Sequence, residues 1–474
     1  MYSDWKMKLY WCLPVRLQEA FLSLYACHLD QLYFGGLFLK TTREVKSRSF
    51  ADLEAVRKYQ LSQLKSMIRT AVKDVPYYHR TLGSECEVAS FDDLRCLPQI
   101  NSQQIRGHEH EFLSKKYDIS KMFIEKTSGS TGTSLKSYWD RNSLQCRWAI
   151  NEVRCRLPIG VSQELPRAMV GGRPVVPGNT TSPPYWRLNR RWRQLYMSSY
   201  HISHISAKHY IEALRESGIS WLTGYGSAIA ALAEIAIEQR LRPVEMRAVL
   251  VSGDTLQPSM RKAIEEFFQC KCYDHYGQAE GVCWVMECQF GKMHVIPEFG
   301  VLEILDQTGN PCAPGEVGEM VATGLINRAM PLIRYRMGDE ASWAVDQACD
   351  CGQHFPVIQR LEGRTDDYLI TSDKRRIGRL STAVKRSPSI HSLQIVQDCP
   401  NHAYLLVRPG KTYQTSDANA VVRDITERIG AFSITVRIVE SIPRTKAGKT
   451  RLVVRLSDSP ELINAYRSII PLVG

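Results

Sequence analysis

Apolar residues between residues 50 and 75 recur every three or four positions, which is the spacing of one face of an α-helix. The positions concerned are Leu53, Val56, Leu61, Leu64, Ile68 and Val72. Because Pro76 lacks an N–H group, we expect this helix to end before it. Residues 91–100 predict a shorter helix followed by a turn.

The first forty residues are rich in leucine and aromatic side chains, but Arg16, Glu19 and Asp30 interrupt their apolar stretches. No stretch approaches the roughly 18 uninterrupted apolar residues that a membrane-spanning helix needs, and no secretory signal is visible. We expect residues 1–100 to form a helical region packed on the main domain. The alternative is a helix that touches a membrane surface.

Strand and helix patterns alternate in the middle of the chain. Residues 220–240 predict a short strand, a glycine turn and an alanine-rich helix, and residues 247–270 repeat that plan. In the second unit Pro258 lies near the expected helix start, where its missing N–H has no consequence. Residues 271–280 again predict a strand and a turn. This alternation predicts an α/β fold with parallel strands.

The pattern changes after about residue 295 to short strands separated by Gly, Pro and Asn, including residues 331–339. The last hundred residues predict a small α+β unit. We therefore expect a helical region at 1–100, a core with a β-rich subdomain at 101–362, a boundary at 363–367 and a C-terminal α+β domain at 368–474.

Composition narrows the class of protein. A chain of 474 residues should form two or more domains. Its net charge of +12 suits an anionic ligand, a nucleic acid or an anionic membrane surface. The basic residues are scattered without interleaved aromatics, so we expect no nucleic-acid partner. Fourteen cysteines without a small-scaffold framework favour a reducing, cytoplasmic compartment.

Hydroxyl-bearing residues and glycines are concentrated in one segment: Thr127, Ser128, Gly129, Ser130, Thr131 and Gly132. Glycines let the backbone approach an oxyanion, and N–H groups and hydroxyls can then donate to it. The segment predicts a phosphate-binding loop, with a flexible linker as the alternative. It is not a Walker loop, because the Gly-Lys-Ser/Thr ending is absent.

This segment resembles the phosphate loop of the adenylate-forming superfamily, which includes acyl-CoA synthetases, peptide-synthetase adenylation domains and luciferases. Four later segments are similar to motifs of the same family in the same order. They are Tyr-Gly-Gln-Ala-Glu at 276–280, Tyr-Arg-Met-Gly-Asp at 335–339, Gly-Arg-Thr-Asp-Asp at 363–367 and Pro-Arg-Thr-Lys-Ala-Gly-Lys at 443–449.

The resemblance implies that ATP activates a carboxylic acid as an acyl-AMP while pyrophosphate leaves. Glu280 would hold Mg²⁺ near the ATP phosphates, because a hard cation prefers carboxylate oxygen. Asp339 would accept hydrogen bonds from the ribose hydroxyls. Lys449, on a mobile C-terminal domain, would offset charge in the transition state.

Further positions follow from the same resemblance. Tyr276 with Gly277, and the turn of Ser252, Gly253 and Asp254, would form the wall of the adenine site. Residues 363–367 would be the hinge, with Arg364, beside the nucleotide, and Asp366 at the pivot between two catalytic poses.

Within the superfamily the chain is most similar to the phenylacetate–CoA ligase-like branch, and especially to CapK-type proteins found with capsular and other polysaccharide genes. The segments that carry this likeness are 75–78, 171–177, 185–203, 315–325, 331–340 and 349–367. CoA as acceptor is implied by the branch and not by a recognisable CoA-binding signature. Gly171, Gly172, Tyr225 and Gly226 would line the acyl pocket, or would simply form tight turns.

Cys288, His294, Cys349 and Cys351 form a candidate metal set. Three thiolates and one imidazole can close a tetrahedral zinc site, and related ligases show similar positions. Such a zinc would have a structural role. The alternative is a group of reduced cysteines.

Several functions remain open at this point. The acyl group could pass to CoA, or to an amine or hydroxyl, for example on a sugar intermediate of surface-polysaccharide synthesis. Adenylyl transfer without CoA is a third reading, and a nucleotide-binding module without catalysis is the non-enzyme alternative. The expected partner is a small carboxylic acid, and the expected state is a monomer or homodimer in the cytoplasm or at the inner face of the membrane.

Overall fold

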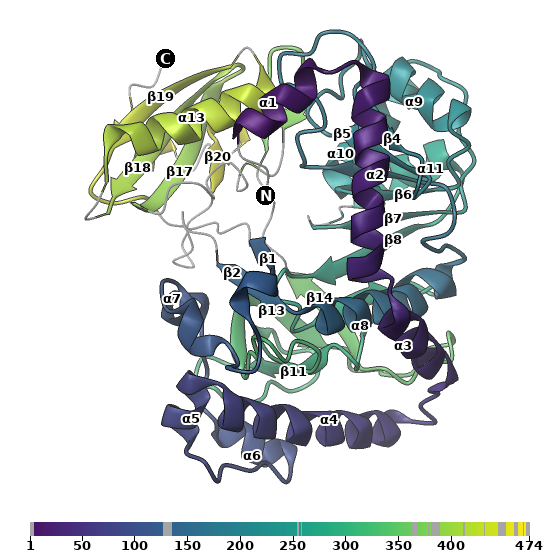
Figure 1. Cartoon of the computed structure of the whole chain (residues 1–474). Coiled ribbons are helices and arrows are strands. Elements are labelled where there is room, and N and C mark those ends of the chain that lie inside the picture. Colours follow the sequence, from purple (N-terminus) through teal and green to yellow (C-terminus); the bar gives the residue numbers. More distant parts are fainter. Residues whose placement is uncertain are drawn as a thin grey trace.

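The computed structural model describes most of the chain. The described residues are 4–126, 135–253, 256, 258–362, 368–377, 380, 389–410, 413–430, 432–443, 452–458, 463–467 and 469–470. Figure 1 shows three parts: helices of the N-terminal region, a large sheet with its covering helices, and a C-terminal α+β domain.

Helices account for most of the first hundred residues. They are α1 (Asp4–Cys12), α2 (Val15–Tyr33), α3 (Gly36–Ser47), α4 (Leu53–Asp74), α5 (Pro76–Leu82), α6 (Phe91–Cys96) and, just beyond, α7 (Ser102–Ile105). The side chain of Asp52 accepts a hydrogen bond from the N–H of Ala55 and so begins α4, which ends before Pro76 as expected. No helix in the described part of the chain is long and apolar enough to cross a membrane.

One sheet of twelve strands runs through the large domain, in the order β11-β12-β13-β14-β10-β9-β8-β7-β6-β3-β5-β4. In one half, five neighbouring strands are parallel: β5 (Gln194–Ser198), β3 (Arg167–Gly171), β6 (Trp221–Gly224), β7 (Ala248–Ser252) and β8 (Cys272–Gly277). Antiparallel β4 (Trp186–Asn189) forms the edge. The connecting helices are α9 (Ala207–Glu216), α10 (Gly226–Glu238) and α11 (Pro258–Phe268).

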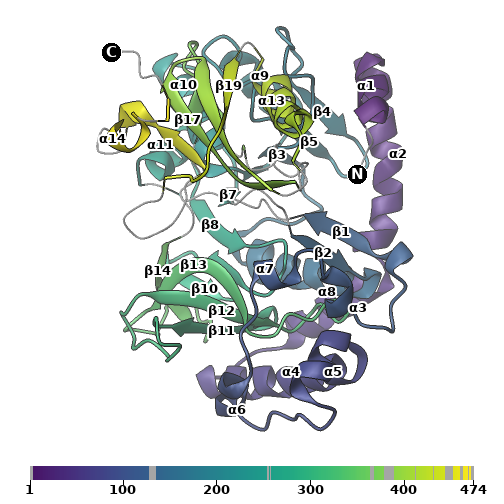
Figure 2. The ribbon, with the colours of Figure 1, turned by 90° about the vertical axis from the view of Figure 1, so that its left-hand side faces the viewer.

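The other half of the sheet is antiparallel. Its strands are β9 (Trp284–Glu287), β10 (Met293–Val295), β14 (Val357–Glu362), β13 (Tyr335–Trp343), β12 (Gly318–Gly324) and β11 (Gly300–Leu305). The strand expected at 331–339 begins only at Tyr335, because Arg334 has a left-handed backbone with φ of 48°. Helices α4–α6 lie beneath this half (Figure 2), where Leu64 and Ile68 pack against Ile304 and Met320.

The sequence pattern did not predict several elements of the core. A hairpin of β1 (Phe123–Lys126) and β2 (Lys136–Trp139) flanks residues 127–134, and α8 (Arg141–Asn151) follows it. The β4–β5 hairpin occupies the segment noted above only for its family likeness.

The C-terminal domain is α+β, as expected. Its strands are β15 (Leu369–Ile370), β16 (Arg376–Ile377), β17 (Ile390–Cys399), β18 (His402–Pro409), β19 (Ser433–Ile438) and β20 (Val453–Arg455), and its helices are α13 (Thr415–Ile429) and α14 (Ile463–Tyr466). Tyr200 of the large domain packs into its core, and Arg375 donates a 2.8 Å hydrogen bond to the Tyr200 carbonyl. This contact joins the C-terminal domain to the parallel half of the sheet.

Candidate adenylation site and cysteine–histidine cluster

The carboxyl ends of β6, β7 and β8 lie together, because these strands are parallel and in register. Gly224 is opposite Val251, and Ser252 is opposite His275. Beyond β8 the sheet changes from parallel to antiparallel. Ligands of open α/β sheets bind at the carboxyl ends of strands where the order changes. Four of the residues predicted from the sequence, Ser252, Gly253, Tyr276 and Gly277, lie at this edge.

A buried polar network connects β8 with β13. The Tyr276 hydroxyl donates a 2.6 Å hydrogen bond to Oδ2 of Asp339, and the Gln278 amide donates to the same oxygen at 2.8 Å. Asp339 is only 6% exposed. Burial, together with the neighbouring Asp339, raises the pKa of Tyr276 well above 10, so its hydroxyl remains a donor. The predicted Tyr276 and Asp339 therefore form one unit, with Gln278 as a third member that the sequence did not single out.

Glu280 lies one turn beyond β8 and is 8% exposed. Its Oε1 accepts a 2.8 Å hydrogen bond from the hydroxyl of Tyr335, the first residue of β13. The next residue, Gly281, has a φ of +65°, and a Cβ there would lie 2.4 Å from the Trp139 ring. The Trp139 indole donates to the Ala279 carbonyl at 3.3 Å. A close turn, fixed by Tyr335 and Trp139, thus holds the Glu280 carboxylate.

Other predicted site residues lie outside the described residues. They are Thr127, Ser128, Gly129, Ser130, Thr131, Gly132, Asp254, Arg364, Asp366 and Lys449. Their flanks are described in part. Glu125 on β1 forms a 2.8 Å ion pair with Arg147, whose guanidinium lies 4.7 Å from the Trp139 ring centroid. The base of the β1–β2 hairpin is therefore packed against the residues that hold the Glu280 turn.

The proposed acyl-pocket residues also lie at this edge of the sheet. The Tyr200 hydroxyl donates to the Gly172 carbonyl at 2.9 Å. A Cβ at Gly172 would lie 2.9 Å from the Tyr225 hydroxyl, so a larger residue there would displace the tyrosine. Close packing against Tyr225 therefore explains why residue 172 is a glycine, independently of the role in an acyl pocket expected from the sequence.

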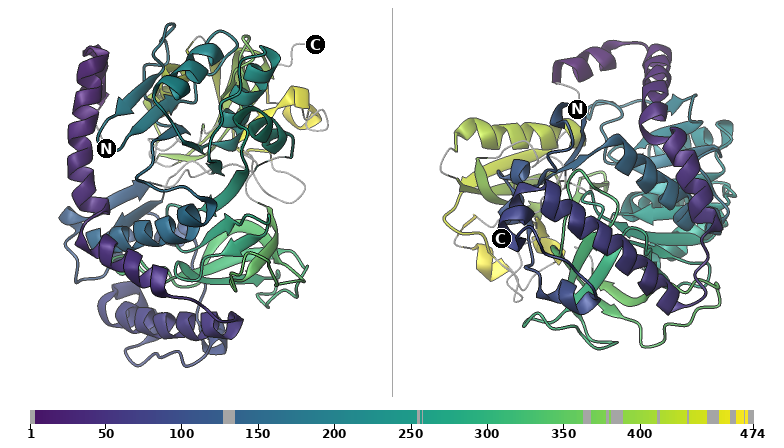
Figure 3. Two further views of the ribbon diagram at one scale, coloured as in Figure 1. Left: turned by 90° about the vertical axis from the view of Figure 1, so that its right-hand side faces the viewer. Right: turned by 60° about the horizontal axis from the view of Figure 1, so that its bottom comes forward.

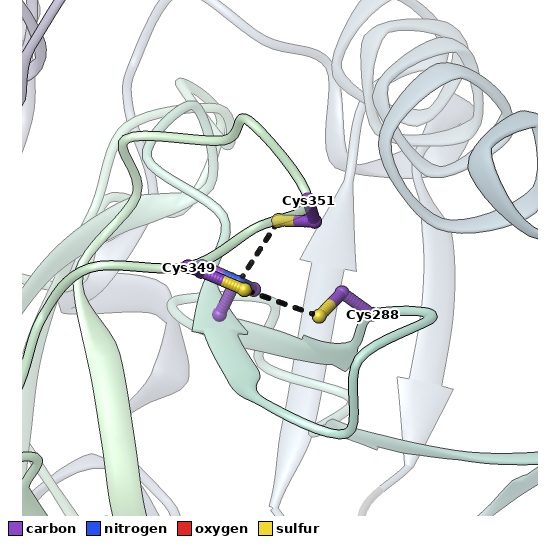
Figure 4. A group of neighbouring side chains, drawn as sticks. Cys288, Cys349 and Cys351 are labelled. Carbon is purple, nitrogen blue, oxygen red and sulfur yellow. Dashed lines mark hydrogen bonds between the residues drawn. The ribbon is translucent and has the colours of Figure 1, made fainter.

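The candidate metal residues converge from two connections of the antiparallel half. Cys288 follows β9, His294 is on β10, and Cys349 and Cys351 precede β14; their donor atoms all lie within 4.8 Å of one another. Figure 4 shows the three cysteines gathered in this way. The Cys288 and Cys349 sulfurs are 3.6 Å apart, and the Cys351 sulfur is 3.4 Å from Nε2 of His294.

The surroundings of this cluster orient its donor atoms. Nδ1 of His294 lies 3.3 Å from the Phe355 carbonyl, which leaves Nε2 directed to the sulfurs. The backbone N–H groups of Phe290 and Gln353 each donate to a cysteine sulfur at 3.4 Å. Burial raises the pKa of Cys351 to about 12 in the metal-free protein. A bound cation would reverse that effect by favouring the thiolate.

Comparisons with known proteins show which families and folds the chain is similar to. Residues 194–327 match the family model described as AMP-binding enzyme, and residues 369–456 match the CapK C-terminal domain. Protein CapK of Staphylococcus aureus is 26% identical over 381 residues, which is 78% of this chain and 82% of that protein. Phenylacetate-coenzyme A ligase of Thermus thermophilus is 24% identical over 435 residues, covering 86% and 90% of the two chains.

Among solved structures, 2-hydroxyisobutyryl-CoA ligase in complex with 2-HIB-AMP and CoA has a TM-score of 0.56 at 19% identity. The match covers 86% of this chain and 92% of that one, and it shows a shared fold. The chain thus carries an AMP-binding domain and a CapK C-terminal domain, and it is similar over most of its length to CapK and to phenylacetate-coenzyme A ligases.

Proposed function

We propose that this protein uses ATP and Mg²⁺ to activate a carboxylic acid as an acyl-AMP and then transfers the acyl group to CoA. The observation that carries the proposal is the pair of buried carboxylates at the end of β8. Asp339 is held by Tyr276 and Gln278, and Glu280 is held by Tyr335. Two oriented carboxylates at a topological switch point suit a nucleotide with its cation.

Each carboxylate has a distinct task in this proposal. The hydrogen bonds to Oδ2 fix the orientation of Asp339, so that its carboxylate can accept the ribose hydroxyls. Ser252, Gly253, Tyr276 and Gly277 border the adenine at the strand ends. Oε1 of the Gln278 amide is buried and has no hydrogen-bond partner in the described part of the chain, and a donor on the bound nucleotide would satisfy it.

The reaction then requires little covalent chemistry from the protein. An oxygen of the acid attacks the α-phosphorus of ATP, and pyrophosphate leaves. The protein aligns the two substrates and neutralises charge through the 127–132 loop and Lys449. Glu280 would hold Mg²⁺, which supplies further charge neutralisation at the phosphates.

Transfer to the acceptor would follow rotation of the C-terminal domain about residues 363–367, with Arg364 and Asp366 at the pivot. CoA is favoured as acceptor because the relatives include phenylacetate-coenzyme A ligases. The second candidate is an amine or hydroxyl acceptor, or adenylyl transfer, in surface-polysaccharide synthesis. The match of residues 369–456 to the CapK C-terminal domain favours it, because in this proposal that domain carries the surface that the acceptor meets.

We also infer a structural zinc at Cys288, His294, Cys349 and Cys351. Tetrahedral zinc with Zn–S bonds of about 2.3 Å separates two sulfurs by about 3.8 Å. The observed separation of 3.6 Å and the orientation of His294 through Nδ1 both fit that geometry. Zinc would fasten the β9–β10 hairpin, which follows Glu280, to the loop that follows β13. Strand β13 itself carries Asp339.

The decisive experiment is acid-dependent pyrophosphate release from ATP and Mg²⁺, screened over aryl, fatty, amino and sugar acids with and without CoA. We expect release with one acid class and a thioester only when CoA is present. Release without thioester formation would favour the second candidate.

Replacing Lys449 by Ala should nearly abolish pyrophosphate exchange while ATP still binds. Unchanged exchange would contradict the catalytic role proposed for Lys449.

A further inference from the structure

Helix α2 packs on the protein through its polar side. Gln18 is only 2% exposed, and Nε of Arg187 donates a 2.6 Å hydrogen bond to its Oε1. The carboxylate of the next residue, Glu19, accepts from the N–H of Leu188 at 3.0 Å, and one turn further along the Ser23 hydroxyl accepts from the N–H of Arg190 at 3.1 Å.

The position of α2 explains this polar contact. Strand β4 is the last strand in the sheet order, so the N–H groups on its outer side have no neighbouring strand to accept their hydrogen bonds. An unpaired sheet edge is usually covered or capped. Polar side chains of α2 supply the acceptors for Leu188 and Arg190, and they therefore have to point inward.

The opposite side of α2 is apolar and exposed. Leu17, Phe21 and Leu24 are 49%, 56% and 68% exposed, and Tyr25 beside them is 42% exposed. The spacing of four and three residues places Leu17, Phe21 and Leu24 on one face of the helix, and Tyr25 borders that face. Leu9 of α1, which is 60% exposed, adds to the apolar surface of this terminus. Figure 3 (left) shows α2 at the outer margin of the fold.

Cationic side chains accompany this apolar face. Lys8 and Arg16 are exposed, and the side chains of Arg190 and Arg191 beside α2 are 73% and 59% exposed. Of the carboxylates of α1 and α2 whose side chains are described, Glu19 lies 3.8 Å from Arg190, and Asp30 lies 2.7 Å from Arg191. These pairs offset the charges of Arg190 and Arg191, so the net positive charge among these described side chains is that of Lys8 and Arg16.

We propose that α1 and α2 seat the protein on the surface of an anionic phospholipid membrane, with Leu17, Phe21 and Leu24 at the boundary between headgroups and acyl chains. A helix with an apolar face and flanking cations lies in the plane of such an interface. A second copy of the chain would bring the same cations together, which electrostatic repulsion opposes. This inference goes beyond the proposed ligase activity and does not depend on it.

Sedimentation with vesicles tests the proposal without an activity assay. The wild-type chain should sediment with phosphatidylcholine vesicles that contain phosphatidylglycerol, hardly at all with phosphatidylcholine alone, and less at high salt. The triple variant Leu17→Ser, Phe21→Ser, Leu24→Ser should bind at least about tenfold more weakly, because each change removes apolar area from the buried face. A control variant with Ile205→Ser and Val345→Ser, which changes residues 80% and 73% exposed on other elements, should bind like the wild type.

Two outcomes would overturn the proposal: no phosphatidylglycerol-dependent sedimentation of the wild type, or full binding by a folded triple variant. Light scattering tests whether a second copy of the chain covers this face instead of a membrane. A wild-type dimer that becomes a monomer in the triple variant would show that the face mediates self-association, and it would reject the membrane proposal. If circular dichroism shows the triple variant to be unfolded, the charge variant Lys8→Glu, Arg16→Glu replaces it. That variant should bind more weakly, and unchanged binding would equally reject the proposal.

Discussion

The two halves of the twelve-stranded sheet contribute to the candidate site in different ways. In the parallel half, β6 and β7 end at Gly224 and at Ser252-Gly253, and what these turns offer a ligand is mainly backbone. In the antiparallel half, side chains from β13 hold the site: Asp339 accepts from Tyr276, and Tyr335 orients Glu280. Substitutions in the parallel half should therefore destabilise the fold, because there is no room for an added side chain. Substitutions in the antiparallel half should lower activity, because a functional group is lost.

The largest expected effect comes from Gly224→Ala in the parallel half. Gly224 has a φ of +146°, and a Cβ there would lie 1.9 Å from the Val170 carbonyl oxygen. Because the neighbouring strand cannot retreat without breaking the sheet, the free energy of unfolding should fall by about 4 kcal/mol or more. Gly36→Ala is the matched control, since nothing lies within 4 Å of its Cβ position. Equal urea midpoints for the two variants would show that the parallel half tolerates the added methyl group.

The next largest effect should follow Asp339→Asn in the antiparallel half. The change keeps the shape but removes the charge that accepts the Tyr276 and Gln278 hydrogen bonds. Pyrophosphate exchange should fall about 100-fold, or about 3 kcal/mol, with little change in melting temperature. The control is Asp92→Asn, whose side chain is 83% exposed on α6. A loss of stability as large as the loss of exchange would make Asp339 a structural residue.

Removal of the proposed zinc should have an intermediate effect. Cys351→Ser should lower the zinc content measured by atomic absorption from one per chain to near zero. It should also lower the free energy of unfolding by about 2 kcal/mol, because the loop before β14 loses its attachment. Cys96→Ser, at an exposed cysteine, is the control. A wild-type protein that contains no zinc would leave this cluster as a group of reduced thiols.

The smallest effect should come from Tyr335→Phe, which removes the hydroxyl group that donates a hydrogen bond to Glu280. We expect the Mg²⁺ concentration for half-maximal pyrophosphate exchange to rise about fivefold, which corresponds to about 1 kcal/mol. Tyr413→Phe in the C-terminal domain serves as the control. An unchanged Mg²⁺ requirement would show that Tyr335 does not orient Glu280 for binding the cation. Tyr335 would then contribute only packing.

Local sequence patterns predicted the parallel half well, because each strand, glycine turn and helix is a continuous segment. The units β6–α10 and β7–α11 lie where the pattern placed them. The four Cys and His residues grouped from the sequence also meet in the structure. The roles of the site residues and the presence of zinc stay predictions.

Contacts between distant segments could not be predicted in the same way. Tyr276 and Asp339 are 63 residues apart, and three strands separate β8 from β13 in the sheet order, so their meeting depends on how the whole sheet curls. Gln278 gave no sequence signal beyond its position inside a motif. Helix α2 shows a second limit of prediction from sequence. The apolar spacing identifies an apolar face of the helix, but the polar face turns inward because it covers the unpaired edge of β4, and the sequence of α2 alone does not reveal that edge.

The cysteine–histidine cluster also sets the conditions under which the protein can be handled. Sulfur atoms 3.6 Å apart need to approach by only about 1.6 Å to form a disulfide, once no cation holds them. A chelator in a purification buffer would remove such a cation, and peroxide could then oxidise two of the thiols to a disulfide, itself being reduced to water, beside the strands that carry Glu280 and Asp339. An inactive preparation would in that case reflect the history of the sample and not the choice of acid, so thiol titration should precede any substrate screen.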